Sequence, residues 1–190
     1  MKKRLVSAFI LFAALLITQV GCVSHVQTDS QKTKSLVAYF SYSGTTEAFA
    51  RDIAELTASD LYRIEAEVPY SQEDINVKNP NSRVSLEQAD DKARPALAHP
   101  LSNLDEYQVI YLGYPIWLSK APKTVYSFVE KYDLKDKKII PFCTSHQSGM
   151  GESADMLEVL APEAVWLPGQ GFTADDDELD VRAFLENLQI

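Results

Sequence analysis

The sequence of 190 residues predicts an α/β domain in which helices cover both faces of a parallel sheet. From residue 35 onward, five apolar segments alternate with segments whose apolar residues recur at helical spacing. Each apolar segment is short and continuous, which is typical of strands buried on both faces. Hydrophobic residues make up 46% of the chain, enough for one well-buried core at this length.

The first strand is predicted at 36–40, where it ends at a cluster of serine, glycine and threonine. The helix after it, 46–58, has Phe49 and Ile53 on one face and Thr45 or Thr46 available as N-cap. The other predicted strands are 61–64, 109–113, 138–143 and 164–167, and the later predicted helices are 122–132, 152–160 and 177–188.

A long connection, 66–105, separates the second predicted strand from the third. Four prolines interrupt it, and only 85–93 has a helical pattern. A connection of this length in a compact domain is more often functional or partly disordered than inert.

The first 22 residues have the features of a secretory signal. Basic residues at 2–4 precede ten uninterrupted apolar residues at 8–17, too few for a membrane span, which needs about 20. Gly21 followed by Cys22 resembles a bacterial lipobox, although Gln19 stands where that pattern prefers leucine. Cys22 is therefore the candidate lipidation site, and ordinary signal cleavage nearby is the alternative.

Residues 23–34 are polar and predict a tether, so the expected folded domain is 35–190. We expect this domain to be exported to the cell envelope and attached to a membrane through a lipid anchor only, outside the cytoplasm.

The charge of the chain excludes several classes of function. Its net charge is −9, and the part after residue 22 carries −12 because the first 22 residues hold three basic residues and no acid. Such a body repels phosphate backbones, which argues against nucleic-acid binding. Two cysteines and three histidines are too few for a Cys/His zinc site, and no metal site is expected.

Ligands of open parallel sheets bind at the carboxyl ends of strands. The loop after the first predicted strand, 41–46, combines serine and threonine hydroxyls with a glycine before a helix N-terminus, which suits a phosphate. It has no lysine and lacks P-loop spacing, so NTP hydrolysis is disfavoured. A helix cap with spare serines is the alternative.

Two further loops follow the third and fourth predicted strands. In the first of these, Trp117 follows Pro115 and can present its face to a planar ring, with a core aromatic as the alternative. The second, 144–151, is polar and suits a heteroaromatic edge. Residues 149–154 fit GxGxxA, but in the fourth βα unit instead of the first. Cys143 beside His146 is interpreted as a buried small hydrophobe, not a nucleophile.

Three sequence blocks resemble the flavodoxin family: YFSYSGTT at 39–46, GYPIW at 113–117 and PFCTS at 141–145. The resemblance covers 35–190. It implies a doubly wound sandwich whose five parallel strands lie in the order 2-1-3-4-5, with flavin mononucleotide (FMN) as cofactor. It implies no catalytic side chain, because FMN carries the chemistry. The implied binding residues are Ser41, Ser43, Gly44, Thr45 and Thr46 at the phosphate; Pro115, Ile116, Trp117 and Leu118 on one side of the isoalloxazine ring; and Thr144, Ser145, His146, Gln147, Ser148 and Gly149 on its other side and edge.

Two departures from the family pattern fall on the ring side. Leu118 and Ser119 stand where the family usually has Trp-Gly, and His146 and Gln147 replace small residues. These changes bear on flavin affinity and potential, since a protonated histidine beside a reduced ring would stabilise its negative charge.

The expected function is electron transfer by an exported FMN protein to redox partner proteins with a basic face. One alternative is an FMN-dependent NAD(P)H/quinone-type oxidoreductase of the same fold, with 66–105 as candidate lid. The other is a flavin-less binding domain.

Overall fold

The computed structural model describes residues 33–146 and 148–188. Within the chain, Lys32–Ile190 form a compact unit of their own. The predicted signal segment, Cys22, all but the last two residues of the predicted tether, and Gln147 lie outside the described residues. Among the residues that the structure describes, no helix has the length and apolar character needed to cross a bilayer.

One parallel sheet organises the domain, and its strands lie in the order β2-β1-β3-β4-β5. This order confirms the predicted fold class. The two central strands β3 and β4 are buried along almost their whole length, which explains their continuous apolar sequences. The strands are β1 (Ser35–Tyr39), β2 (Asp60–Arg63), β3 (Val109–Pro115), β4 (Lys138–Thr144), β5 (Val165–Trp166) and β6 (Gln170–Phe172).

The last strand of the sheet is divided in two. β5 pairs with the first two residues of β4, and β6 pairs with its last three. Between them, Pro168 has no amide hydrogen to donate to a neighbouring strand. A Cβ at Gly169 would collide with the carbonyl of Pro141. The prediction of a strand at 164–167 found β5 and missed β6, because β6 contains no apolar run.

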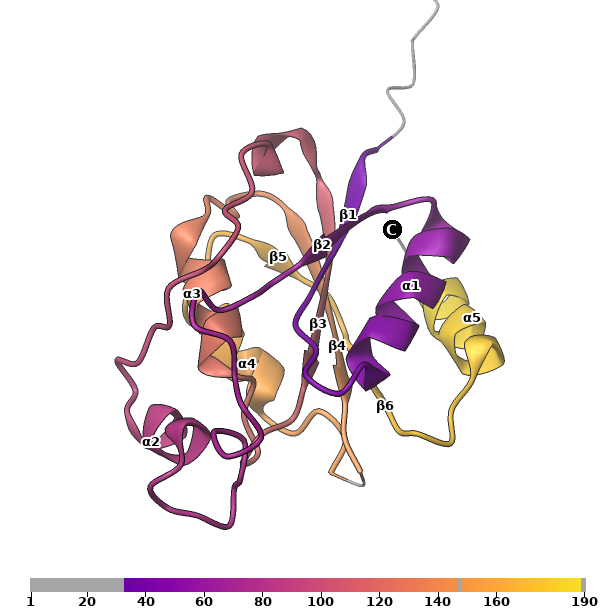
Figure 1. The fold of residues 1–190 in the computed structure, drawn as a ribbon. Coiled ribbons are helices and arrows are strands. Elements are labelled where there is room, and N and C mark those ends of the chain that lie inside the picture. The colour runs from indigo at the N-terminus through magenta and orange to yellow at the C-terminus, as the bar shows by residue number, and fades with distance from the viewer. Residues whose placement is uncertain (1–32, 147, 189–190) are drawn as a thin grey trace, which may run out of the picture. The chain divides into compact units, whose positions relative to one another are not determined.

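Helices cover both faces of the sheet (Figure 1). On one face, α1 and α5 pack through Phe49, Ile53 and Phe184. On the other, α3 and α4 pack through Val125 and Leu157. The helices are α1 (Thr45–Thr57), α2 (Arg83–Ala89), α3 (Lys123–Lys131), α4 (Ser153–Glu158) and α5 (Glu178–Asn187), with a 3-10 turn η1 (Leu104–Glu106).

The interpretation of Cys143 as a buried small hydrophobe is confirmed. Cys143 is fully buried, and burial raises the pKa of its thiol to about 12, so it has the character of a small hydrophobe. Trp166 is half-buried, packs against the same cluster and donates its indole N–H to the carbonyl of Ala161.

The long connection after β2 folds back along the carboxyl ends of the strands. Ala66 and Leu97 form an isolated antiparallel β-bridge within it. The segment between these two residues includes α2, at the lower left of Figure 1. The helix begins at the N-cap Ser82, whose hydroxyl accepts the N–H of Ser85, and it ends at Ala89, earlier than the predicted 85–93. This connection brings side chains against the loop that follows β3.

Candidate functional site

The loop from β1 to α1 opens the helix with a glycine. Gly44 is the N-cap, with φ of 94° in the left-handed region, and no side chain caps the helix. Because the first intrahelical bond runs from the Ala48 amide to the Gly44 carbonyl, the amides of Thr45, Thr46 and Glu47 have no intrahelical acceptor. A Cβ at Gly44 would have no protein atom within 4 Å. The helix therefore begins in open space with free donors, which suits an anion.

The hydroxyls of this loop hold its shape. The Gly44 amide donates to Ser41 Oγ at 3.1 Å, and Ser43 Oγ lies 3.1 Å from Thr45 Oγ1. The prediction that Thr45 or Thr46 is the N-cap was wrong. Both lie in the first helical turn, because the left-handed conformation of Gly44 starts the helix one residue earlier.

One hydrogen bond joins the first turn of α1, on the phosphate side, to the end of β4. Thr46 Oγ1 and Thr144 Oγ1 lie 2.8 Å apart, and both residues are buried. Residues 98 positions apart in the sequence are thereby brought together, as expected for strands that end at one edge of a sheet.

Arg63, at the end of β2, supports the same loop. It donates to the carbonyl of Ser41 at 3.1 Å and to the Glu47 carboxylate at 2.9 Å. Arg51 donates to Glu47 at 2.6 Å, and these two guanidinium groups hold the pKa of Glu47 below its usual range. The charge of the acid in the first helical turn is therefore balanced. No sequence pattern indicated Arg63 as a site residue, because it lies outside the three predicted loops.

β3 leads into a tight turn between Trp117 and Lys120. The N–H of each donates to the carbonyl of the other, at 2.9 and 3.0 Å. Leu118 and Ser119 have φ of 50° and 66°, a conformation that glycine adopts without strain. Leu118 and Ser119, which stand where the resemblance implies Trp-Gly, therefore adopt a backbone conformation that glycine would favour.

Trp117 is half-buried in an aromatic cluster. Its ring meets Phe40 edge to face at 5.2 Å between centroids and Tyr70 at 5.4 Å. Phe40 follows β1, and Tyr70 comes from the long connection, so three parts of the chain fix the indole. No periodic pattern in the sequence predicts this role for Tyr70, which lies in an irregular segment. Presentation of the Trp117 face to a planar ligand stays a prediction.

The loop after β4 contains an unpartnered buried oxygen. Ser145 Oγ is buried and has no hydrogen-bond partner among the described residues, while its amide donates to the carbonyl of Phe172. Buried polar atoms are nearly always partnered, so this hydroxyl is a candidate ligand contact. His146 and Ser148 are exposed, and Gly149 has φ of 58°.

A cleft of about 400 Å³ lies between the loops after β3 and β4. We call it the ring cleft; its volume is in the range of small-molecule pockets. Of the residues predicted to line the isoalloxazine, Ile116, Ser148 and Gly149 line it. Within the described ranges, no three His, Cys, Asp or Glu side chains converge as a metal site. The residues lining the ring cleft are Ile116, Ser119, Lys120, Ser148, Gly149, Met150, Gly151, Glu152 and Met156.

Solved structures similar to this one include two Bacteroides proteins assigned as flavoproteins. The one from B. eggerthii is 38% identical, with a TM-score of 0.79 over 84% of this chain and 99% of its own. The one from B. uniformis is 34% identical, with a TM-score of 0.79 over 83% and 100%.

A flavoprotein from Lactobacillus acidophilus, crystallised in complex with FMN, is 19% identical, with a TM-score of 0.59 over 78% of this chain and 97% of its own. At that identity the likeness shows the fold alone. No curated protein matches the sequence. A family model described as flavodoxin matches residues 34–188, and the chain belongs to this family.

Proposed function

We propose that the chain is an exported FMN protein that transfers electrons at the outer side of a membrane. The observation that carries the cofactor assignment is the start of α1. There, Gly44 opens a helix whose first amides have no intrahelical acceptor, and a side chain at Gly44 would meet no protein atom within 4 Å. Membership of the flavodoxin family and the FMN complex of the Lactobacillus flavoprotein support the same cofactor.

The residues of the site fit FMN. The amides and hydroxyls of 43–46 would hold the phosphate, and the balanced charge of Glu47 leaves the helix start free of net repulsion. The ring cleft would take part of the isoalloxazine, with Trp117 held rigidly beside it. Ser145 Oγ, which has no protein partner in the described residues, would bond a polar edge of the ring.

Bound FMN supplies a ring that accepts and releases electrons. The protein contributes binding, orientation and electrostatics, and no side chain has to act as acid, base or nucleophile. Because the part of the chain after residue 22 has a net charge of −12, its partners are redox proteins with a basic face. Transfer to a basic c-type cytochrome, used as a probe, should therefore slow as salt is raised.

The first experiment is an FMN titration of residues 32–190. This part is suitable because the Bacteroides structures, 99% and 100% of whose chains match this one, contain almost only this domain. We expect tight binding with quenched flavin fluorescence, weakened by Trp117→Ala. Absence of binding at micromolar FMN would overturn the cofactor assignment and favour a flavin-less binding domain.

Export and lipid attachment rest on residues 1–22. Full-length protein expressed in bacteria should incorporate labelled fatty acid and sediment with membranes. Cys22→Ser should abolish both while leaving the FMN titration unchanged. A wild-type chain without label would contradict the lipid anchor.

A second candidate function is an FMN-dependent NAD(P)H/quinone-type oxidoreductase. It is favoured by a further cleft of about 460 Å³ beside the phosphate-side loop, with walls that include Tyr42, Tyr70 and His99. Turnover of quinone with NAD(P)H would separate this enzyme from a carrier, which exchanges electrons with proteins only.

A further inference from the structure

Lys123, the first residue of α3, is a buried cation. Its side chain is 1% exposed, and the one carboxylate within 4 Å of Nζ among the described residues is that of Asp91, at 3.9 Å and itself 89% exposed. Burial lowers the pKa of Lys123, as do the nearby charges of Lys120 and Arg94. A buried charge with such a distant partner destabilises the fold.

Two other cations share the surroundings of Lys123. Lys120 Nζ lies 3.8 Å from the same Asp91 oxygen. Arg94 lies over the same Tyr126 ring as Lys123, at 5.2 and 4.4 Å from its centroid. Arg94 is paired with the Glu130 carboxylate at 2.7 Å.

The other acids near the two lysines are Asp90 and Asp91, and Glu152, which lines the ring cleft with Lys120; all three are exposed. Their charges are screened by water more than those of the buried lysine. The positive charge of the pair Lys120 and Lys123 is therefore only partly balanced.

The long connection contacts this part of the chain, and one layer of side chains separates Lys123 from the ring cleft. Lys123 Nζ lies over the Tyr126 ring, the Tyr126 hydroxyl donates to Met156 Sδ at 3.8 Å, and Met156 lines the ring cleft. Gln88 in α2 donates its amide to the carbonyl of Ala121 at 2.9 Å, and Lys120 donates to the Gln88 carbonyl at 3.3 Å. Lys120 itself lines the ring cleft. Lys123 begins α3, whose N-terminus adds partial positive charge of its own.

We propose that Lys123, together with Lys120, raises the reduction potential of the bound flavin. This inference rests on the proposed FMN site. Reduction by two electrons with uptake of one proton leaves a flavin ring one unit more negative than before. Positive charge beside the ring cleft favours that reduced state over the oxidised state. The effect of the two lysines on the reduction potential is therefore opposite to that of the net negative charge of the domain.

The test is the midpoint potential of FMN-loaded 32–190, titrated with dithionite against a reference dye. Lys123→Met keeps the length of the side chain and removes its charge. We expect oxidised FMN to bind within about twofold of wild type and reduced FMN to bind about tenfold more weakly, which lowers the midpoint by about 30 mV. Because the removed charge is buried, the shift should persist in high salt.

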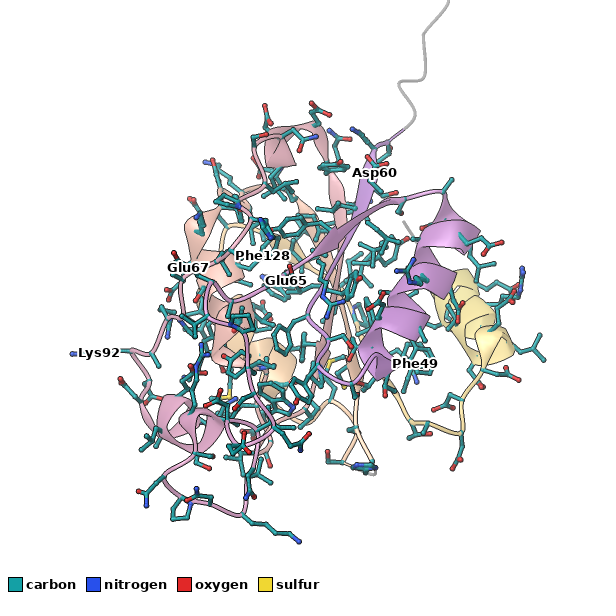
Figure 2. The ribbon with its side chains drawn as sticks, viewed as in Figure 1. Phe49, Asp60, Glu65, Glu67, Lys92 and Phe128 are labelled. Carbon is teal, nitrogen blue, oxygen red and sulfur yellow. The ribbon has the colours of Figure 1, made fainter. Side chains whose placement is uncertain are left out.

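The matched control is Lys92→Met. Lys92 is next to Asp91 in the sequence, is exposed and projects away from the domain (Figure 2). Its removal should leave the midpoint unchanged. A urea midpoint for each variant checks folding, and Lys123→Met should be as stable as wild type or more so, since a well-packed apolar residue replaces a buried charge.

The outcomes separate this inference from the function on which it rests. If wild type binds no FMN, both are overturned. If Lys123→Met binds FMN normally at an unchanged potential, only the role of the lysine is overturned, as it is if Lys92→Met shifts the potential equally. A Lys123→Met shift that high salt abolishes overturns the buried-charge explanation.

Discussion

The turns after β1 and β3 use the same left-handed backbone in different ways. On the phosphate side the conformation falls on Gly44, whereas on the ring side it falls on Leu118 and Ser119. Each non-glycine residue in this region costs about 1–2 kcal/mol, so the phosphate-side turn is relaxed and the ring-side turn is strained. The reciprocal bonds between Trp117 and Lys120 hold the strained turn in place. At the start of α1 the residue itself, a glycine, favours the left-handed conformation. In the ring-side turn that conformation is unfavourable for Leu118 and Ser119, and hydrogen bonds between the flanking residues maintain it.

The largest effect should come from placing a side chain on the relaxed turn. Gly44→Val has open space, so its cost is backbone strain of about 2 kcal/mol. If the turn stays left-handed, this strain lowers the unfolding free energy; if the free turn relaxes and FMN binding must restore it, the strain instead weakens FMN affinity by up to roughly 30-fold. FMN titration and urea unfolding measure both quantities. Ala58 also has a left-handed φ, of 51°, at the other end of α1. Ala58→Gly is the matched control and should stabilise the domain without changing affinity.

Ser145→Ala tests whether the ring side is built for a ligand. Without FMN the variant should be as stable as wild type or slightly more so, because it removes an unpartnered buried hydroxyl. With FMN it should bind about fivefold more weakly, the loss of roughly 1 kcal/mol of hydrogen bonding. Thermal melts without FMN measure the change in stability, and thermal melts with FMN measure the change in affinity. Equal affinity in the two proteins would refute a flavin contact by this hydroxyl.

Leu118→Gly tests the strain of the ring-side turn directly. We expect a gain of about 0.5–1 kcal/mol in unfolding free energy, because relief of the left-handed strain exceeds the entropy that glycine adds to the unfolded chain. Leu118→Ala removes the same exposed side chain and keeps the Cβ, so it should show no gain. A gain as large for alanine would attribute the effect to exposed apolar surface.

The smallest effect concerns the ion pairs at the start of α1. Glu47 has a pKa below its ordinary value of 4.5 in the folded state, so its stabilising effect is present above that value and is lost as pH falls through the lower folded-state pKa. Glu47→Gln should cost less than about 1 kcal/mol at pH 7, and the difference from wild type should shrink in acid. Urea unfolding at pH 7 and pH 3 measures it, with Glu55→Gln on the same helix as control.

Local patterns were sufficient to predict the five strands and the three loops, because buried parallel strands and helix starts leave local signals, whereas the order of the strands was implied by the resemblance to the flavodoxin family. Local patterns were insufficient for contacts between distant segments. Tyr70 against Trp117 depends on how the long connection folds, which no periodicity specifies. The helical pattern of α3 identified its apolar residues, but Lys123 is buried because that connection covers the start of the helix, and a lysine at such a position is ordinarily exposed. Export, lipid attachment and partners stay predictions.

The bond between the hydroxyls of Thr46 and Thr144 has a thermodynamic consequence. It links the first turn of α1, on the phosphate side, to the end of β4, where the ring-side loop begins. A ligand that restricts motion on one side therefore reduces the entropy that the other side still has to lose. Inorganic phosphate and riboflavin, the two halves of FMN, should therefore bind with positive cooperativity, and by linkage each should raise the affinity of the other by the same factor.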